Sequence, residues 1–161
     1  MQVVIGLGCP YLTDDGVGPR VVRQLLTGDE LPGVRLVESH AGGLLLVEEL
    51  AGADRAVIVD ALWDTRRVPG EVLIAGVETV TRNAACGHDC SLAEALAIGR
   101  GMGIPLPPDE AIHLVAVVAG DVATFSEQLT PAVQEALTDV CSTVLKLVQE
   151  RTGYPDGGNH A

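Results

Sequence analysis

Near the N-terminus, two carboxylates lie beside a glycine-rich turn. Asp14 and Asp15 follow the apolar run Val3–Ile5 and precede Gly16, so they lie where a predicted buried strand gives way to a helix. Open α/β sheets bind ligands beyond the carboxyl ends of their strands, so paired acids at this position predict a ligand site. Asp is also favoured at helix starts as a cap and by the helix dipole, so a purely structural role for Asp14 stays open.

A third carboxylate and an imidazole complete the candidate set. Asp60 closes the apolar stretch Ala56–Asp60, which is another predicted central strand. An acid at the carboxyl end of such a strand favours a functional role for its side chain over a structural one. His88 lies in the sequence CGHDC at 86–90, just before a predicted helix. One imidazole with two carboxylates suits a divalent transition-metal ion with open coordination positions. We therefore predict that Asp15, Asp60 and His88 converge on one metal ion.

The histidine segment has two other interpretations, and both stay open. A histidine in a loop is often only solvated. Cys86, His88 and Cys90 could instead form a closed structural metal site, although their spacing is tighter than that of usual zinc-binding pairs. The sequence offers no second pair of ligands to complete such a site, which favours the catalytic type of metal site.

Cys9 and His40 are additional candidates at the same predicted edge of the sheet. Cys9 follows Gly8 at a strand end, where a nearby helix N-terminus can lower the pKa of a thiol. The neighbouring acids oppose a thiolate, and a cysteine nucleophile would need a nearby base, so this role is disfavoured. His40 follows the predicted strand Val34–Ser39 and could either add a metal ligand or face solvent.

The alternation of strands and helices predicts one α/β domain. Strands are expected at 3–5, 34–39, 56–60, 71–75 and 114–119, and helices at 15–27, 44–51, 91–99 and 130–151. We expect a single three-layer domain with a mostly parallel, twisted sheet of about five strands and helices on both faces. This domain is predicted to span residues 1–151, with 152–161 as a flexible C-terminal tail.

Composition and charge exclude several classes of protein. The 161-residue chain is 47% apolar but only 2% aromatic, so aliphatic side chains must build its core. Its net charge of −12 argues against a nucleic-acid partner and favours a metal cation or a basic peptide segment. We expect no signal peptide and no membrane span. The four cysteines follow no regular disulfide pattern, so a cytoplasmic protein with reduced thiols is expected.

The glycines of the opening segment do not form a dinucleotide-binding fingerprint. The pattern G-x-G-x-x-G requires a third glycine, and Tyr11 stands in its place after Gly6 and Gly8. Acidic residues also crowd the predicted helix entrance, where a pyrophosphate would be repelled. The sequence contains no phosphate-binding loop of the form G-x-x-x-x-G-K-[ST].

Three segments together resemble the hydrogenase maturation proteases. They are GLGCPYLTDDGVGPRVV at 6–22, VIVDALW at 57–63 and GHDCSL at 87–92. The resemblance implies an endopeptidase that removes a C-terminal extension from the large subunit of nickel–iron hydrogenase. It places the three metal ligands of the family on Asp15, Asp60 and His88. One departure is Cys9, which stands where the family usually has Asn.

The resemblance also implies the partner and the metal. The substrate would be the precursor of a nickel–iron hydrogenase large subunit, and nickel would arrive already bound to that precursor. Zinc or cadmium can take the place of nickel in vitro. Asp15, Asp60 and His88 would bind this ion, and no serine, cysteine or resident-zinc mechanism is implied.

Two other functions are kept as alternatives. A non-catalytic nickel-binding chaperone or sensor would use the same three ligands without cutting a peptide bond. A peptidyl-tRNA hydrolase also opens with a strand and turn of the form GLGNP. That enzyme needs a basic surface for tRNA, and a net charge of −12 argues against it.

Overall fold

Five strands and four α-helices alternate along residues 1–40, 42–77 and 90–150, the part of the chain that this computed structural model describes. The elements in chain order are β1 (Gln2–Leu7), the 3-10 turn η1 (Thr13–Gly16), α1 (Val17–Leu26), β2 (Val34–Ser39), α2 (Leu44–Leu50), β3 (Arg55–Leu62), β4 (Val72–Ala75), α3 (Leu92–Gly101), the 3-10 turn η3 (Asp109–Ala111), β5 (Ile112–Val118) and α4 (Pro131–Gln149). Among the helices described, none has the length and apolar character of a membrane span.

The strands form one sheet in the order β2-β1-β3-β5-β4. All neighbouring pairs are parallel except β4 and β5, which are antiparallel. The chain passes from β3 to β4 without a crossover helix. It therefore re-enters the sheet at the end where β3 finished, and β4 must run in the opposite direction to β3. The prediction of a mostly parallel five-stranded sheet is confirmed.

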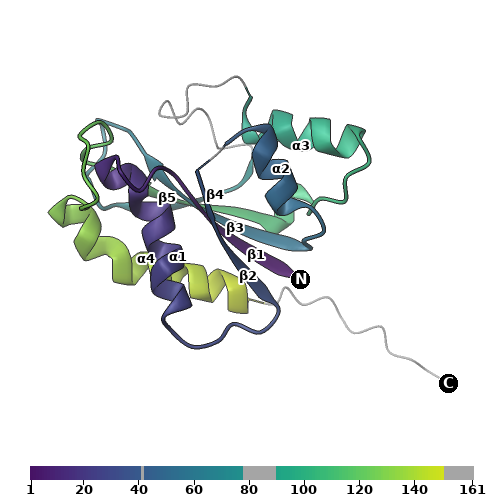
Figure 1. Cartoon of the computed structure of the whole chain (residues 1–161), viewed down its shortest axis with the longest axis horizontal. Helices are drawn as coiled ribbons and strands as arrows, with labels where there is room; N and C mark the ends of the chain where they lie inside the picture. The colour runs from purple at the N-terminus through teal and green to yellow at the C-terminus, as the bar shows by residue number, and fades with distance from the viewer. Residues whose placement is uncertain (41, 78–89, 151–161) are drawn as a thin grey trace.

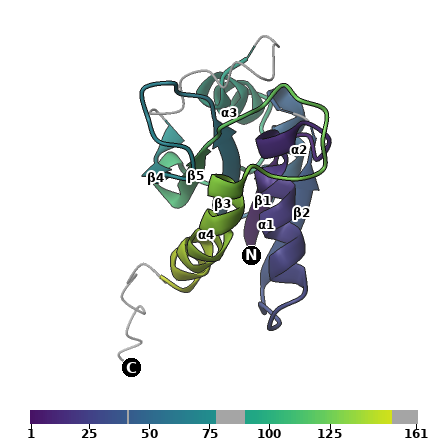
Figure 2. The ribbon, with the colours of Figure 1, turned by 90° about the vertical axis from the view of Figure 1, so that its left-hand side faces the viewer.

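Helices cover both faces of this sheet (Figures 1 and 2). The core on one face joins α1 and α4 to strand residues such as Val57 and Val59. The core on the other face joins α2 and α3 to the alternate residues, such as Ala56 and Ile58. Because both sides of the central strands are buried, their sequences read as continuous apolar runs. Aliphatic side chains form both cores, as the composition predicts.

Several predicted boundaries differ from the structure by one or two residues, and two of them lie near the candidate site. The helix expected from residue 15 begins at Val17, because residues Thr13–Gly16 form a 3-10 turn. Thr13 has a φ of 52°, and its amide donates a hydrogen bond to the Ser126 carbonyl of a distant loop. This tertiary contact holds the backbone away from the conformation that would start α1 earlier.

The second wrong boundary concerns Asp60, which does not close β3. The strand continues to Leu62 because its pairing with β5 continues to that residue. Its pairing with β1, in contrast, stops at Gly6 opposite Val59. Asp60 is therefore the first residue of β3 beyond its pairing with β1. On its other side, Asp60 is still paired with β5.

Glycines let α1 pack backbone to backbone against the sheet. A Cβ atom on Gly18 would lie 2.4 Å from the Leu7 carbonyl oxygen and 2.6 Å from the Val59 carbonyl oxygen. A Cβ atom on Gly6 would lie 2.1 Å from the Gly18 carbonyl oxygen. Real Cβ atoms do not approach backbone this closely, so any larger residue here would push α1 away from β1 and β3.

We expect Gly18→Ala to lower the free energy of unfolding by about 2 kcal/mol or more, since rigid backbone atoms must move to admit the methyl group. Urea denaturation measures this change. The matched control is Gly101→Ala at the end of α3, where nothing lies within 4 Å of the added methyl. That variant should be unchanged or up to about 1 kcal/mol more stable. Equal stability of the two variants would contradict the close packing.

Candidate functional site

The direction of the chain connections reverses between β1 and β3, and the carboxyl end of this switch point is called the crevice below. The chain leaves β1 toward β2 on one side, and after β3 it continues to strands on the other side. Connections that diverge in this way leave a gap at the carboxyl ends of the two strands, where open α/β sheets bind ligands. Asp15 follows β1 and Asp60 belongs to β3, so the two predicted ligands come from the two strands that flank this crevice.

Asp15 is a buried carboxylate held by the turn that follows β1. Its residue is 6% exposed, and its Oδ2 accepts a hydrogen bond of 2.7 Å from the Cys9 amide. Gly8 makes this approach possible, because its φ is 132° and a Cβ atom there would lie 1.9 Å from the Asp15 carbonyl oxygen. Burial raises the pKa of Asp15, while the hydrogen bond from the Cys9 amide opposes this shift. Ionisation of Asp15 is therefore less favourable than that of an exposed aspartate.

Asp60 is buried as well, with 8% of its residue exposed. It lies opposite Ala116 in the β3–β5 ladder, one residue beyond the last pair with β1. Val59 and Ala61 belong to the core on the α1 and α4 face. Since successive strand side chains alternate between faces, Asp60 belongs to the α2 and α3 face.

His88 lies outside the described residues, so the structure does not test its position. Described residues before and after this segment pack on one face of the sheet. Val77 and Leu92 both pack in the core on the α2 and α3 face, which is the face of Asp60. Cys90 also lies on this side, 3.9 Å from the position that a Cβ atom on Gly43 would take at the start of α2.

The carboxylate of Asp14 joins the loop after β1 to the segment between β5 and α4. It is fully buried and accepts hydrogen bonds from the amides of Gly120, Asp121 and Thr130 at 2.7, 3.1 and 2.7 Å. The Thr130 hydroxyl donates a fourth bond, of 2.8 Å. This acid, for which the sequence left open a helix cap or a ligand role, therefore ties the loop after β1 to the loop after β5 and to the start of α4.

Thr130 occupies the predicted N-cap position of α4, with Pro131 in the first turn. Its side chain makes no capping hydrogen bond to the helix, and its hydroxyl donates to Asp14. The sequence signal for a helix start was thus correct, but the hydroxyl serves a contact 116 residues away along the chain.

Cys9 and His40 meet at the same turn as Asp15. The His40 Nδ1 lies 3.0 Å from the Gly8 carbonyl oxygen. A carbonyl only accepts hydrogen bonds, so Nδ1 donates in this contact and Nε2 is the ring nitrogen that could bind a cation. His40 is exposed and Cys9 is half-buried. Within 1–40, 42–77 and 90–150, however, no three His, Cys, Asp or Glu side chains could together hold a metal ion.

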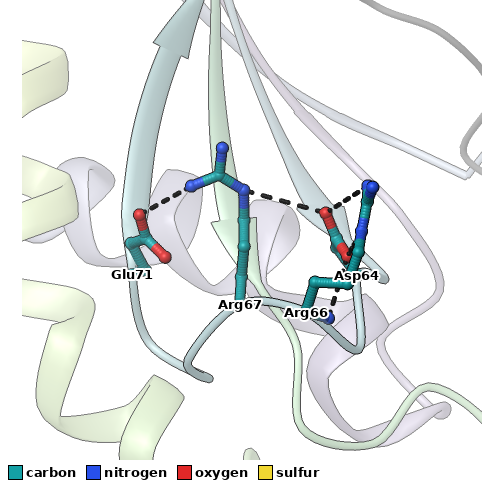
Figure 3. A network of polar contacts seen from close by, with 4 residues as sticks. All are labelled: Asp64, Arg66, Arg67 and Glu71. Atoms are coloured by element: carbon teal, nitrogen blue, oxygen red, sulfur yellow. Dashed lines mark hydrogen bonds and ion pairs between the residues drawn. The ribbon is translucent and has the colours of Figure 1, made fainter.

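An ion-pair network that the sequence analysis did not identify holds the loop after β3 (Figure 3). Asp64 accepts hydrogen bonds from Arg66, and these hold the pKa of the Asp64 carboxyl below its usual range. Arg67 lies between Asp64 and Glu71, 2.8 Å from the Glu71 Oε1. These exposed ion pairs contribute little stability individually, but together they fix the path of the segment that leaves Asp60.

Comparisons with known proteins agree on one family. A family model described as hydrogenase maturation protease matches residues 19–147. The Hydrogenase 2 maturation protease of Escherichia coli (strain K12) is 28% identical over 152 residues, covering 92% of this chain and 90% of that protein. The solved hydrogenase-maturating endopeptidase HybD from E. coli aligns with a TM-score of 0.75, 25% identity and 92% coverage of both chains. An endopeptidase from E. coli, solved in solution, aligns with a TM-score of 0.79, 27% identity and 93% coverage of both.

Removal of the charge should affect the free energy of unfolding differently at the two adjacent acids. Asp14→Asn should lower the free energy of unfolding at neutral pH by about 1–3 kcal/mol, because an amide cannot accept from four donors. Asp15→Asn should not, because it removes a carboxylate whose charged form burial disfavours. Urea denaturation of both variants and the wild type measures these changes.

The effect of Asp15 should also depend on pH. The pKa of Asp15 is raised from 3.8 in the folded state, so its stabilising contribution is complete below 3.8 and is lost as pH rises through the folded pKa. The stability of Asp15→Asn relative to the wild type should therefore increase between about pH 4 and about pH 7. A relative stability that falls over this interval would contradict the burial of Asp15.

Proposed function

The chain belongs to the hydrogenase maturation protease family and is a peptidase, and we propose that it cleaves the precursor of a nickel–iron hydrogenase large subunit in the cytoplasm. The cut removes the C-terminal extension of that precursor after nickel has been inserted. Nickel is part of the substrate in this proposal, and Asp15, Asp60 and His88 bind it. One observation carries the proposal: a buried carboxylate in the turn that follows β1 and another in β3 flank the crevice between these strands.

The environment of Asp15 supports an incoming cation. A buried carboxylate is normally paired, since loss of hydration disfavours its charged form. Among the described residues, Asp15 has a side-chain hydrogen bond from the Cys9 amide and no ion pair. A divalent cation at this carboxylate would offset the desolvation that raises its pKa.

The chemistry of the three ligands supports an ion that the substrate brings with it. Two carboxylates and one imidazole leave coordination positions open, unlike the four-ligand shell of a structural zinc site. The precursor fills these positions with its own ligands to nickel. The shared ion then fixes the scissile peptide bond relative to the protein, and a divalent cation in contact with the scissile carbonyl polarises it.

Cleavage should depend on the metal state of the precursor. We expect this protein to release the C-terminal peptide from nickel-loaded precursor and not from metal-free precursor of identical sequence, because the isolated ligands bind the ion weakly. Mass spectrometry of both precursor forms, before and after incubation, measures release. Binding of the loaded precursor without release would support a nickel chaperone instead. Equal cleavage of both forms would contradict the assigned role of the three ligands.

Substitutions should separate the metal ligands from the thiol. Asp15→Ala, Asp60→Ala and His88→Ala should each lower kcat/KM by about 100-fold or more, the scale of losing one stabilising group in an active site. Cys9→Ser should stay within about threefold of the wild type, because the group that contacts Asp15 is the backbone amide of Cys9. A folded but inactive Cys9→Ser protein would instead favour a thiol nucleophile or a thiol ligand.

A further inference from the structure

Every aromatic side chain in the described part of the chain is exposed. Tyr11, Trp63 and Phe125 are 50%, 48% and 81% exposed, and the buried core contains no aromatic ring. The whole sequence has only four such residues, and the fourth, Tyr154, lies outside the described segments. Large rings dominate the energetics of cores and interfaces, so a protein that keeps these three in water exposes surface suited to a partner.

All three rings come from the carboxyl edge of the sheet. Tyr11 lies in the loop after β1, Trp63 directly follows β3, and Phe125 lies in the loop between β5 and α4. These strands are the neighbouring central strands β1, β3 and β5. Asp15 lies in the same connection as Tyr11, and Asp60 lies three residues before Trp63. The aromatic side chains therefore flank the crevice that contains the two candidate ligands.

Backbone contacts fix two of the rings in place. Tyr11 and Phe125 stack with their centroids 6.2 Å apart and an angle of 16° between planes. The Ser126 amide donates to the Tyr11 carbonyl, and the Thr13 amide donates to the Ser126 carbonyl, each at 2.9 Å. Leu12 and Ser126 thereby form a short parallel bridge, and Figure 2 shows the loop from β5 to α4 passing beside η1.

The third ring belongs to Trp63, which directly follows β3, and a backbone hydrogen bond also holds the end of this strand. The Ala119 amide donates a hydrogen bond of 2.9 Å to the Leu62 carbonyl, which holds the end of β3 against the end of β5. The network of Asp64, Arg66, Arg67 and Glu71 begins at the residue after Trp63 (Figure 3). A rigid, pre-formed apolar surface loses little conformational entropy when a partner covers it.

We propose that Tyr11, Trp63 and Phe125 form an aromatic rim on which the polypeptide of the hydrogenase precursor docks beside the cleaved bond. This inference rests on the proposed function. A protein that brings an ion to both Asp15 and Asp60 must lay its chain over the loops after β1 and β3, and these loops present the rings. Aromatic residues are enriched at protein interfaces and carry much of their binding energy.

The first test compares the kinetics of precursor processing. Phe125→Ser and Trp63→Ala should each raise KM for the nickel-loaded precursor about tenfold, equivalent to about 1.4 kcal/mol of binding, with kcat within about twofold. The control is Leu26→Ser, because Leu26 is 62% exposed and ends α1 at the opposite edge of the sheet. Its KM should not change. Urea denaturation checks that each variant is as stable as the wild type.

The outcomes separate the rim from the proposed function. If the wild type does not cleave the precursor, the proposed function fails. If the wild type cleaves and the rim variants have the same KM as Leu26→Ser, the rim is overturned and the proposed function stands. A dimeric wild type that becomes monomeric in Phe125→Ser, with KM unchanged, would assign the rings to self-association and also overturn the docking role.

A second readout does not depend on cleavage. Trp63 is the only tryptophan of the chain, so protein grown with 5-fluorotryptophan gives one ¹⁹F resonance from the rim. Addition of unlabelled precursor should shift or broaden that resonance, and the Phe125→Ser variant should require about tenfold more precursor for the same change. An unchanged resonance at saturating precursor would overturn the rim even where cleavage proceeds.

Discussion

The buried carboxylate of Asp14 holds together the edge of the sheet on which the candidate site depends. Its four hydrogen bonds join the connection after β1, the loop after β5 and the start of α4. Charge-assisted bonds of this kind are stronger than bonds between neutral groups, and they are least screened when buried. Asp15, the next residue, therefore emerges from a fixed backbone, and so does the bridge that positions Tyr11 and Phe125. One acid thus organises the edge, while among the described residues its neighbour accepts a hydrogen bond from the Cys9 amide.

Much of the fold follows from the sequence because parallel strands buried on both faces leave a strong signal. The strand Val34–Ser39 and the start of α2 at Leu44 agree with prediction to the residue. Two boundaries that failed near the candidate site are decided by distant segments. The Ser126 carbonyl delays the start of α1, and pairing with β5 extends β3 past Asp60. Hydrophobic periodicity is a property of one segment at a time, so it carries no information about contacts between distant segments.

The places of Asp15 and Asp60 in the fold were predictable in outline for the same reason. Asp15 and Asp60 stand beside apolar runs, and the carboxyl ends of β1 and β3 flank the crevice of the sheet. The sequence could not separate the roles of Asp14 and Asp15, because both acids suit the start of a helix. Only the tertiary structure shows four donors converging on Asp14 and one on Asp15. The position of His88 stays a prediction.

Under the proposed function, the burial of Asp15 would couple binding of the ion to loss of a proton. Desolvation raises the pKa of this carboxyl, so a proton and a metal ion compete for the same oxygen atoms. An ion that bound there would displace the proton, and its apparent affinity would rise with pH through the pKa of Asp15. A precursor without its metal would leave this buried carboxylate without a positive partner. The protein would therefore favour the precursor that arrives with a positive charge.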